Sequence, residues 1–379
     1  MQQFFKLPKE AIQPIADKFG TPLLVVSRNQ VKENYELLMK HIPGIKIHYA
    51  MKSNPDINIL KQLIDSGSCF DVASDGEMEL LAELDVAPDR IVYANPVKTW
   101  NGLNTAKRIG VYKMTYDSDI EVEKMASAVP GAQVLIRVRV DNPKALVDLN
   151  SKFGCYPEEA LFLMRRARKL GLDVLGMCFH VGSQTLSVDP YIQGIETCKR
   201  LFDVAALDGF NLRVLDIGGG FPVPAAGTNF DVVKAFDTIA HALGKKFPAI
   251  EIWCEPGRYI CGTAVNLLTS VIANIIKNDK QWYFLDEGIY GSFSAKMFDH
   301  WEFSFETNTY DRPEVKATFA GPSCDSIDVV LSNVKTPRLE MNDVLLFPIA
   351  GAYTAASASS FNGFRLAKSV CWEDIENTI

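Results

Sequence analysis

The chain has 379 residues, of which 47% are hydrophobic and 22% are charged, as expected for a globular protein with a sizeable core. This length predicts two domains, or one large barrel with an appended domain. The formal net charge of −7 and the lack of a basic stripe argue against nucleic acid as a partner.

The N-terminal residues 1–20 carry charges and proline where a signal peptide requires an unbroken apolar run. No stretch approaches the ~18 uninterrupted apolar residues of a membrane helix. The eight cysteines are scattered without a CxxC pair, which favours reduced, mostly buried thiols in a chain of this kind. We therefore expect a cytoplasmic protein that contacts no membrane, and the dispersed histidines and cysteines predict no metal site.

Between Leu23 and Tyr259, short β-rich runs alternate with longer segments whose apolar residues recur at helical spacing. The eight runs are 46–52, 70–74, 91–95, 113–117, 134–140, 175–183, 214–220 and 252–258. Strand–helix alternation implies right-handed crossovers and a parallel sheet. Eight repeats match a closed (β/α)₈ TIM barrel of the α/β class better than an open doubly wound sheet, which is the alternative.

After Arg258 the helical spacing gives way to strand-like runs separated by turn-like joints. These runs are 265–276, 282–290, 300–306, 328–334, 343–354 and 364–372. The run 265–276 could be misread as a helix, but its β-branched residues favour a strand. We predict a (β/α)₈ domain over 22–258 and a mainly-β barrel or sandwich domain over 259–379, joined by residues 1–21.

The run KIHYAMK, residues 46–52, ends in a lysine, although lysine is rarely buried without a partner or a role. Either the Lys52 ammonium reaches solvent at the strand end, or it takes part in chemistry there. In barrels of this kind the active site lies at the C-terminal ends of the strands. Polar residues end several other runs as well, which favours the second interpretation.

The motif DIGGGFP places Gly218–Gly220 after an apolar strand. Such glycines can expose backbone N–H groups as an anion-binding nest, or they can simply form a tight turn. In CEPGRY, Arg258 could clamp a phosphate and Glu255 could bind a ring nitrogen. The structural alternative for this second motif is a surface turn with a salt bridge.

The motif HVGS offers a flat imidazole, His180, that could stack on a cofactor ring, and a hydroxyl, Ser183, that could reach a phosphate. A lone histidine at the end of a strand is otherwise a hydrogen-bonded barrel residue. Asp71 could be a turn former, and Glu77 suits the first turn of a helix. A phosphate cradle, a ring-nitrogen carboxylate, a stacking imidazole and a lysine together indicate a pyridoxal phosphate site.

Ordered motifs extend this interpretation along the chain. They are YAMKSNP, FDVASDGEME, ANPVK, SKFG, CFHVGSQ, DIGGGFP, CEPGRY, DEGIYGSF, GPSCDSID, GAYT and FNGF. Their order resembles that of the fold-type III pyridoxal phosphate decarboxylases, and most closely that of the bacterial ornithine/lysine decarboxylases. The resemblance spans nearly the whole chain and implies an alanine-racemase-like barrel followed by a β domain.

The resemblance also assigns roles to individual residues around pyridoxal 5′-phosphate. Lys52 matches the Schiff-base lysine, Glu255 the partner of the pyridinium and His180 the residue that stacks on the ring. The residues that match other cofactor contacts are Asp71, Glu77, Arg137, Ser183, Gly219, Gly220, Gly257, Arg258 and Tyr353.

The second domain is implied to supply the substrate's contacts. Cys324 matches the acid that protonates the α-carbon, although a lone cysteine is by default a small buried hydrophobe. Asp299 and Asp325 match the carboxylates that hold the distal ammonium of a diamino acid, a cation that offsets their mutual repulsion. Tyr290 and Phe361 match residues that line the same pocket.

The resemblance implies decarboxylation of L-ornithine or L-lysine to putrescine or cadaverine through aldimine and quinonoid intermediates. It also implies a head-to-tail homodimer whose two active sites are shared across the interface. The alternatives are a diaminopimelate or carboxynorspermidine decarboxylase, or a regulatory homologue without catalysis. Asp299 and Asp325 would repel the second carboxylate of diaminopimelate, and the catalytic motifs are all present, so both alternatives are disfavoured.

Overall fold

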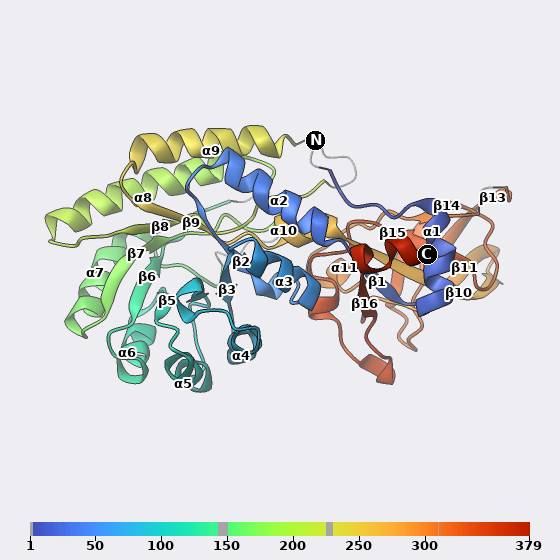
Figure 1. The fold of residues 1–379 in the computed structure, drawn as a ribbon, viewed down its shortest axis with the longest axis horizontal. Helices are drawn as coiled ribbons and strands as arrows, with labels where there is room; N and C mark the ends of the chain where they lie inside the picture. The colour runs from blue at the N-terminus through green and yellow to red at the C-terminus, as the bar shows by residue number, and fades with distance from the viewer. Residues whose placement is uncertain (1–2, 143–150, 225–229, 310) are drawn as a thin grey trace.

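The structure is a computed structural model that describes residues 3–142, 151–224, 230–309 and 311–379 (Figure 1). It contains a closed barrel of eight strands and a separate eight-stranded sheet. In Figure 1 the barrel and its helices lie on the left and the second sheet on the right. This arrangement confirms the predicted TIM barrel followed by a β domain.

All neighbouring barrel strands pair in parallel, and the last strand pairs with the first to close the barrel. The strands are β2 (Lys46–Ala50), β3 (Cys69–Val72), β4 (Ile91–Tyr93), β5 (Lys113–Tyr116), β6 (Gln133–Arg137), β7 (Asp173–Cys178), β8 (Val214–Asp216) and β9 (Glu251–Cys254). Each strand ends before the run that predicted it ends. Lys52, His180 and Glu255 therefore lie beyond the strands at the mouth of the barrel, whereas Asp71 and Arg137 lie on β3 and β6.

The helices around the barrel bury one apolar face each, as their residue spacing predicts. They are α2 (Arg28–His41), α3 (Ile57–Asp65), α4 (Asp75–Glu83), α5 (Trp100–Ile109), α6 (Asp119–Ala128), α7 (Pro157–Lys169), α8 (Asp189–Leu207) and α9 (Val232–Lys246). Side-chain caps fix where several of them begin. For example, the Gln30 N–H donates to Ser27 before α2, and the Glu77 N–H donates to Ser74 before α4.

The second sheet is mixed and contains strands from both ends of the chain. Its members are β1 (Leu23–Val26), β10 (Val265–Lys277), β11 (Lys280–Leu285), β12 (Glu306–Thr307), β13 (Glu314–Ala320), β14 (Val329–Pro337), β15 (Val344–Phe347) and β16 (Lys368–Cys371). The prediction of a strand over 265–276 is confirmed. The predicted run 300–306 is mostly irregular, and only its last residue lies in a strand. The strand β13 was not predicted.

β1 pairs with β10 and β16, so it belongs to the second sheet although it falls within the 22–258 range predicted for the barrel. Its four residues, LLVV, are buried on both faces, a pattern that suits a covered strand in either sheet. The helix α1 (Lys9–Phe19) packs against the same sheet through Ile12 and Ile15.

Four-residue helices occur at α10 (Arg258–Cys261), α11 (Ala295–Phe298) and α12 (Trp372–Ile375). Lys52 lies on a single turn of 3₁₀ helix, η1 (Met51–Ser53), directly after β2. Among the described residues, no helix combines the length and apolar character needed to cross a membrane.

Candidate active site

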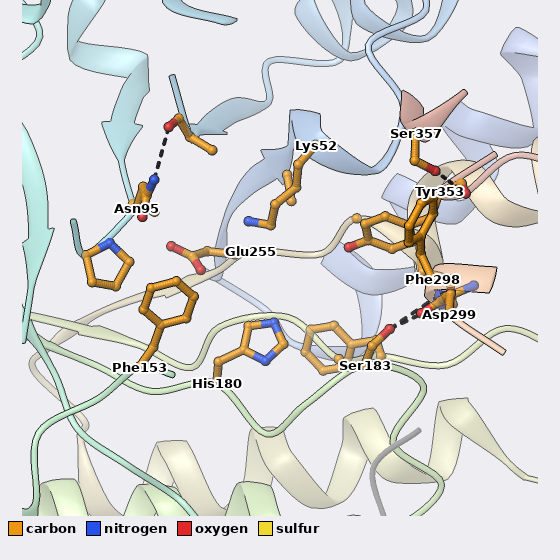
Figure 2. Close-up of a pocket in the computed structure, with 18 of the residues that line it drawn as sticks. Lys52, Asn95, Phe153, His180, Ser183, Glu255, Phe298, Asp299, Tyr353 and Ser357 are labelled. Atoms are coloured by element: carbon orange, nitrogen blue, oxygen red, sulfur yellow. Dashed lines mark hydrogen bonds and ion pairs between the residues drawn. The ribbon is translucent and has the colours of Figure 1, made fainter. Parts of the chain in front are cut away.

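A cavity of about 380 Å³ lies at the C-terminal ends of the barrel strands. Its lining residues from the barrel and its loops are Ala50, Lys52, Ala73, Ala94, Asn95, Pro96, Arg137, Phe153, His180, Ser183, Gly220, Phe221, Glu255, Gly257 and Arg258. The rest of the chain contributes Phe298, Asp299, Tyr353 and Ser357. Figure 2 shows Lys52, Glu255, His180 and Tyr353 pointing toward one shared space.

Lys52 projects into this cavity from the turn after β2, and 42% of its side chain remains accessible. Its ammonium forms an ion pair and a short hydrogen bond with Asp71, which lies on β3 and is buried. Burial lowers the pKa of Lys52, but the charges of Asp71 and then Glu255 outweigh burial and raise that pKa overall. The Lys52 ammonium therefore lies in an open cavity, where it is accessible and is held by Asp71.

Glu255 follows β9 and points into the cavity (Figure 2). Its Oε1 atom is buried and accepts no hydrogen bond from any described residue. Burial raises the pKa of this carboxyl well above its ordinary value, and the nearby Asp216 and Asp71 raise it further. An unpaired buried oxygen at this position is suited to a ligand with a ring nitrogen.

His180 presents a flat neutral ring to the cavity. The Gly182 N–H donates to its Nδ1 over 3.0 Å, which leaves the proton of the neutral ring on Nε2. Burial lowers the pKa of His180 well below its ordinary value, and the cations Arg137 and Lys52 lower it further. An uncharged imidazole can stack on an aromatic ligand.

The opposite end of the cavity has the character of an anion site. Arg258 is buried, and its Nε and Nη2 each lie 3.4 Å from the Ser183 hydroxyl oxygen. The guanidinium also forms an ion pair with Asp299 and lies over the ring of Tyr353 at 5.1 Å. At Gly220 the φ angle is 100°, and a Cβ would lie 2.3 Å from the Gly182 carbonyl oxygen, so only glycine permits this close backbone approach.

Other predicted cofactor residues lie around or behind this cavity. Glu77 accepts a hydrogen bond from the Ala73 N–H over 2.5 Å, which ties the start of α4 to the cavity wall. Arg137 lines the cavity and has a buried Nη2 with no hydrogen-bond partner among the described residues. Gly219 packs against the backbone of Glu255, where a Cβ would lie 2.4 Å from the Glu255 carbonyl oxygen.

Four predicted substrate residues form a separate cluster, which we call the acid cluster: Tyr290, Cys324, Asp325 and Phe361. The Tyr290 hydroxyl donates to Asp325 over 2.5 Å, and the rings of Tyr290 and Phe361 stack at 4.1 Å. Cys324 is exposed, and its N–H donates to Asn362 over 3.1 Å. Among the described residues that line the cavity, none of these four is present, whereas Asp299 is.

Phe298 and Ser357 have no signal in the sequence analysis. Phe298 ends the short helix α11, and Ser357 ends a turn of 3₁₀ helix in a serine- and alanine-rich segment. Phe153 lies in the SKFG motif, to which the sequence analysis assigned no role of its own. Arg137 was predicted, and Asn95 could be found because it lies in the motif ANPVK at the end of a predicted barrel strand.

Comparisons with known proteins agree with this geometry. Residues 28–262 match the family model of the pyridoxal-dependent decarboxylases, in its pyridoxal-binding domain. A lysine/ornithine decarboxylase from Selenomonas ruminantium is 48% identical over 372 residues, covering 98% of this chain and 94% of that protein. An antizyme inhibitor 2 from Xenopus laevis is 34% identical over 363 residues, covering 90% of this chain and 78% of that protein.

A crystal structure of SrLDC in complex with PLP and cadaverine superposes with a TM-score of 0.94 and 45% identity, covering 99% of this chain and 96% of that one. The cavity described above fits pyridoxal 5′-phosphate on its own residues. Arg258, Ser183 and the Gly220 backbone suit the phosphate, the unpaired Glu255 Oε1 suits the ring nitrogen, and Lys52 suits the aldehyde.

Proposed function

The chain belongs to the pyridoxal-dependent decarboxylases, and we propose that it decarboxylates L-ornithine, L-lysine or both, releasing CO₂ with putrescine or cadaverine. The cofactor is pyridoxal 5′-phosphate. The observation that carries this proposal is the convergence of Lys52, Glu255 and Arg258 on one cavity. A lysine, a ring-nitrogen partner and a phosphate site are the three contacts that this cofactor requires.

In the proposed mechanism the bound cofactor supplies a conjugated ring that accepts the electron pair left on the α-carbon when CO₂ departs. Lys52 would hold the cofactor aldehyde, and His180 would support the ring from one face. Arg258 and Ser183 would hold the phosphate and so keep the cofactor in place. Cys324 then donates a proton to the α-carbon, in place of the lost carboxylate.

A diamino acid is the substrate class that the charges favour. Asp299 is a buried carboxylate in the cavity wall, and Asp325 belongs to the acid cluster. Two carboxylates attract the distal ammonium of a diamino acid. They repel the second carboxylate of diaminopimelate, because bringing like charges together in a partly buried site weakens binding. The alternative is a regulatory homologue without catalysis. Such a function does not account for the convergence of Lys52, Glu255 and Arg258 on one cavity.

Mapping the cofactor on the protein tests the proposed site. The purified protein is incubated with pyridoxal 5′-phosphate, reduced with borohydride and digested, and the modified peptide is identified by mass spectrometry. We expect the label on Lys52, the only lysine among the described residues that line the cavity. A label on Lys98, which is buried against Glu121 elsewhere in the barrel, would contradict the assignment.

We expect Asp299→Asn to raise KM for L-ornithine and L-lysine about tenfold, because the distal ammonium loses a charge-assisted hydrogen bond. Steady-state CO₂ release at saturating cofactor measures this effect. Since Asp299 also pairs with Arg258, the affinity for the cofactor is measured separately by absorbance titration. The matched control is Glu302→Gln, an exposed carboxyl three residues away, and an equal KM in both variants would count against the assignment.

We also propose that the enzyme is a homodimer whose cavities are completed across the interface. In one chain the acid cluster does not line the cavity that holds Lys52, yet Cys324 must reach the α-carbon of the substrate. Exposed apolar side chains occur beside both parts: Phe298 at the cavity, and Phe361, Phe364 and Leu366 near the acid cluster. A second copy that covers these side chains would bring Cys324 and Asp325 to the cavity.

The cytoplasm is the proposed location. All eight cysteines are free thiols and seven of them are buried, which fits a reducing compartment.

A further inference from the structure

A second buried carboxyl group lies directly behind Glu255. Asp216 is the last residue of β8 and is 1% exposed. Its Oδ1 accepts a hydrogen bond from the Gly218 N–H over 2.8 Å, and its side chain also shares a hydrogen bond with Glu255. Glu255 therefore has one oxygen engaged with Asp216, while its Oε1 has no partner among the described residues.

The backbone of the barrel fixes this pair. β8 and β9 are neighbours, with Asp216 opposite Trp253 in the parallel register. Beyond the strand ends, the Ile217 N–H donates to the Trp253 carbonyl over 3.0 Å and the Glu255 N–H donates to the Gly218 carbonyl over 2.8 Å. Backbone hydrogen bonds thus continue past the ends of both strands and hold Asp216 and Glu255 side by side.

The charges around the pair favour one shared proton. Burial raises the pKa of Asp216 to about 7, and burial, then Asp216 itself, raises the pKa of Glu255 well above its ordinary value. The other groups that interact electrostatically with the pair are Asp71, Lys52, Arg137, Cys178 and Cys254. Two buried carboxyl groups in contact do not both ionise near neutral pH, so the pair keeps a single negative charge.

We propose that Asp216 is a positioning residue that shares this proton with Glu255 and holds the Glu255 carboxyl as the partner of the cofactor's ring nitrogen. This inference rests on the proposed role of Glu255. With Asp216 as the hydrogen-bond donor, Glu255 is an anion whose free Oε1 faces the cavity. The ring N–H then meets a carboxylate that is already oriented, and the proton that balances the buried charge stays on Asp216.

The first arm of the test uses the full chain without cofactor. An aspartate whose pKa is raised from about 3.9 in the unfolded chain binds its proton more tightly when folded, so the folded protein loses stability as pH rises between the two values. Asp216→Asn keeps the acceptor for the Gly218 N–H but cannot ionise. We therefore expect the difference in melting temperature, Asp216→Asn minus wild type, to increase by roughly 5 °C from pH 5 to pH 8.

The second arm uses the protein loaded with pyridoxal 5′-phosphate labelled with ¹⁵N in the ring, and measures the ring-nitrogen chemical shift and the cofactor affinity. Asp216→Asn should keep the ring nitrogen protonated at pH 8, since its amide can donate to Glu255. Asp216→Ala removes the donor, so we expect a shift toward the unprotonated signal and roughly tenfold weaker cofactor binding. The control is Cys178→Ala, a buried neighbour of the pair, which should match wild type in both measurements.

The outcomes separate the shared proton, the positioning role of Asp216 and the proposed function. Melting profiles of Asp216→Asn and wild type that run parallel across pH 5–8 would overturn the shared proton, whatever the cofactor does. An Asp216→Ala variant that matches Cys178→Ala in ring-nitrogen signal and affinity would overturn the positioning role. If wild type fails to bind the cofactor, the proposed function fails, while the melting profiles still test the carboxyl pair. If Asp216→Ala does not fold, Asp216→Asn still decides the first arm, and a loss of ring protonation in it would also overturn the proposal.

Discussion

We expect Lys52→Ala to lower kcat/KM for decarboxylation of L-ornithine and L-lysine by at least about 10³-fold, because the cofactor would lose the amine that holds its aldehyde and releases the product. No other lysine among the described residues lines the cavity, so no neighbouring amine can take over. CO₂ release at saturating cofactor and substrate measures the loss. The visible absorbance of the bound cofactor, which depends on its bond to the lysine, should change in the same variant.

The control for this variant is Lys61→Ala, an exposed lysine on α3, which should retain wild-type activity. Arg258 and Ser183 remain in the variant, so the phosphate contacts should still retain the cofactor, although more weakly. A Lys52→Ala enzyme that keeps more than a tenth of wild-type activity would remove Lys52 from the chemistry.

Mixing two inactive variants should restore activity. Lys52→Ala lacks the lysine of the cavity, and Cys324→Ala lacks the proton donor of the acid cluster. If each site takes these residues from different copies, a heterodimer carries one site with both defects and one intact site. Random reassortment of equal amounts gives half heterodimers, so we expect about a quarter of wild-type activity.

The matched control mixes wild type with the double variant Lys52→Ala, Cys324→Ala. In that heterodimer each site lacks one of the two residues, so activity should fall to about a quarter through loss of wild-type dimers. Sedimentation at the assay concentration establishes that the chains pair. A mixture of the single variants that stays as inactive as its parts, although heterodimers form, would contradict a site shared between copies.

The barrel could be predicted because its strands are covered on both faces and recur with helices between them. The polar ends of the runs were also informative, since a residue such as Lys52 or Glu255 that follows a buried strand lies at the mouth of the barrel. The predicted runs were too long, however. The run 175–183 continues five residues past Cys178, because the residues there remain largely buried although they have left the strand.

The second sheet was harder to predict, because its strands pair with partners far away in the chain. β13 lies parallel to β11 and antiparallel to β14, and its sequence EVKATFA alternates polar and apolar residues, a strand signal that the sequence analysis missed. β1 is too short and too uniformly apolar for its sequence to indicate which sheet it joins. Such long-range pairings are decided by tertiary packing rather than by local propensity.

The residues of the candidate site also divide into those that could be predicted from the sequence and those that could not. Residues at barrel strand ends could be deduced from their position, and the resemblance added roles to them. The separation of Asp299 from Asp325 could not be deduced, because two acidic residues 26 positions apart carry no information about which cavity each one faces. Phe298 and Ser357 enter the cavity wall from short helical turns between strands of the second sheet, so their positions depend on that sheet.

The most direct test of the central claim is CO₂ release by the purified protein with pyridoxal 5′-phosphate, comparing L-ornithine, L-lysine and meso-diaminopimelate at equal concentrations. We predict turnover of ornithine, lysine or both, with putrescine or cadaverine as product and little turnover of diaminopimelate. Their ratio reports the length of the pocket, since one methylene changes the binding energy by only about 1–3 kcal/mol. Turnover of diaminopimelate alone, or no CO₂ from any of the three with cofactor bound, would contradict the account.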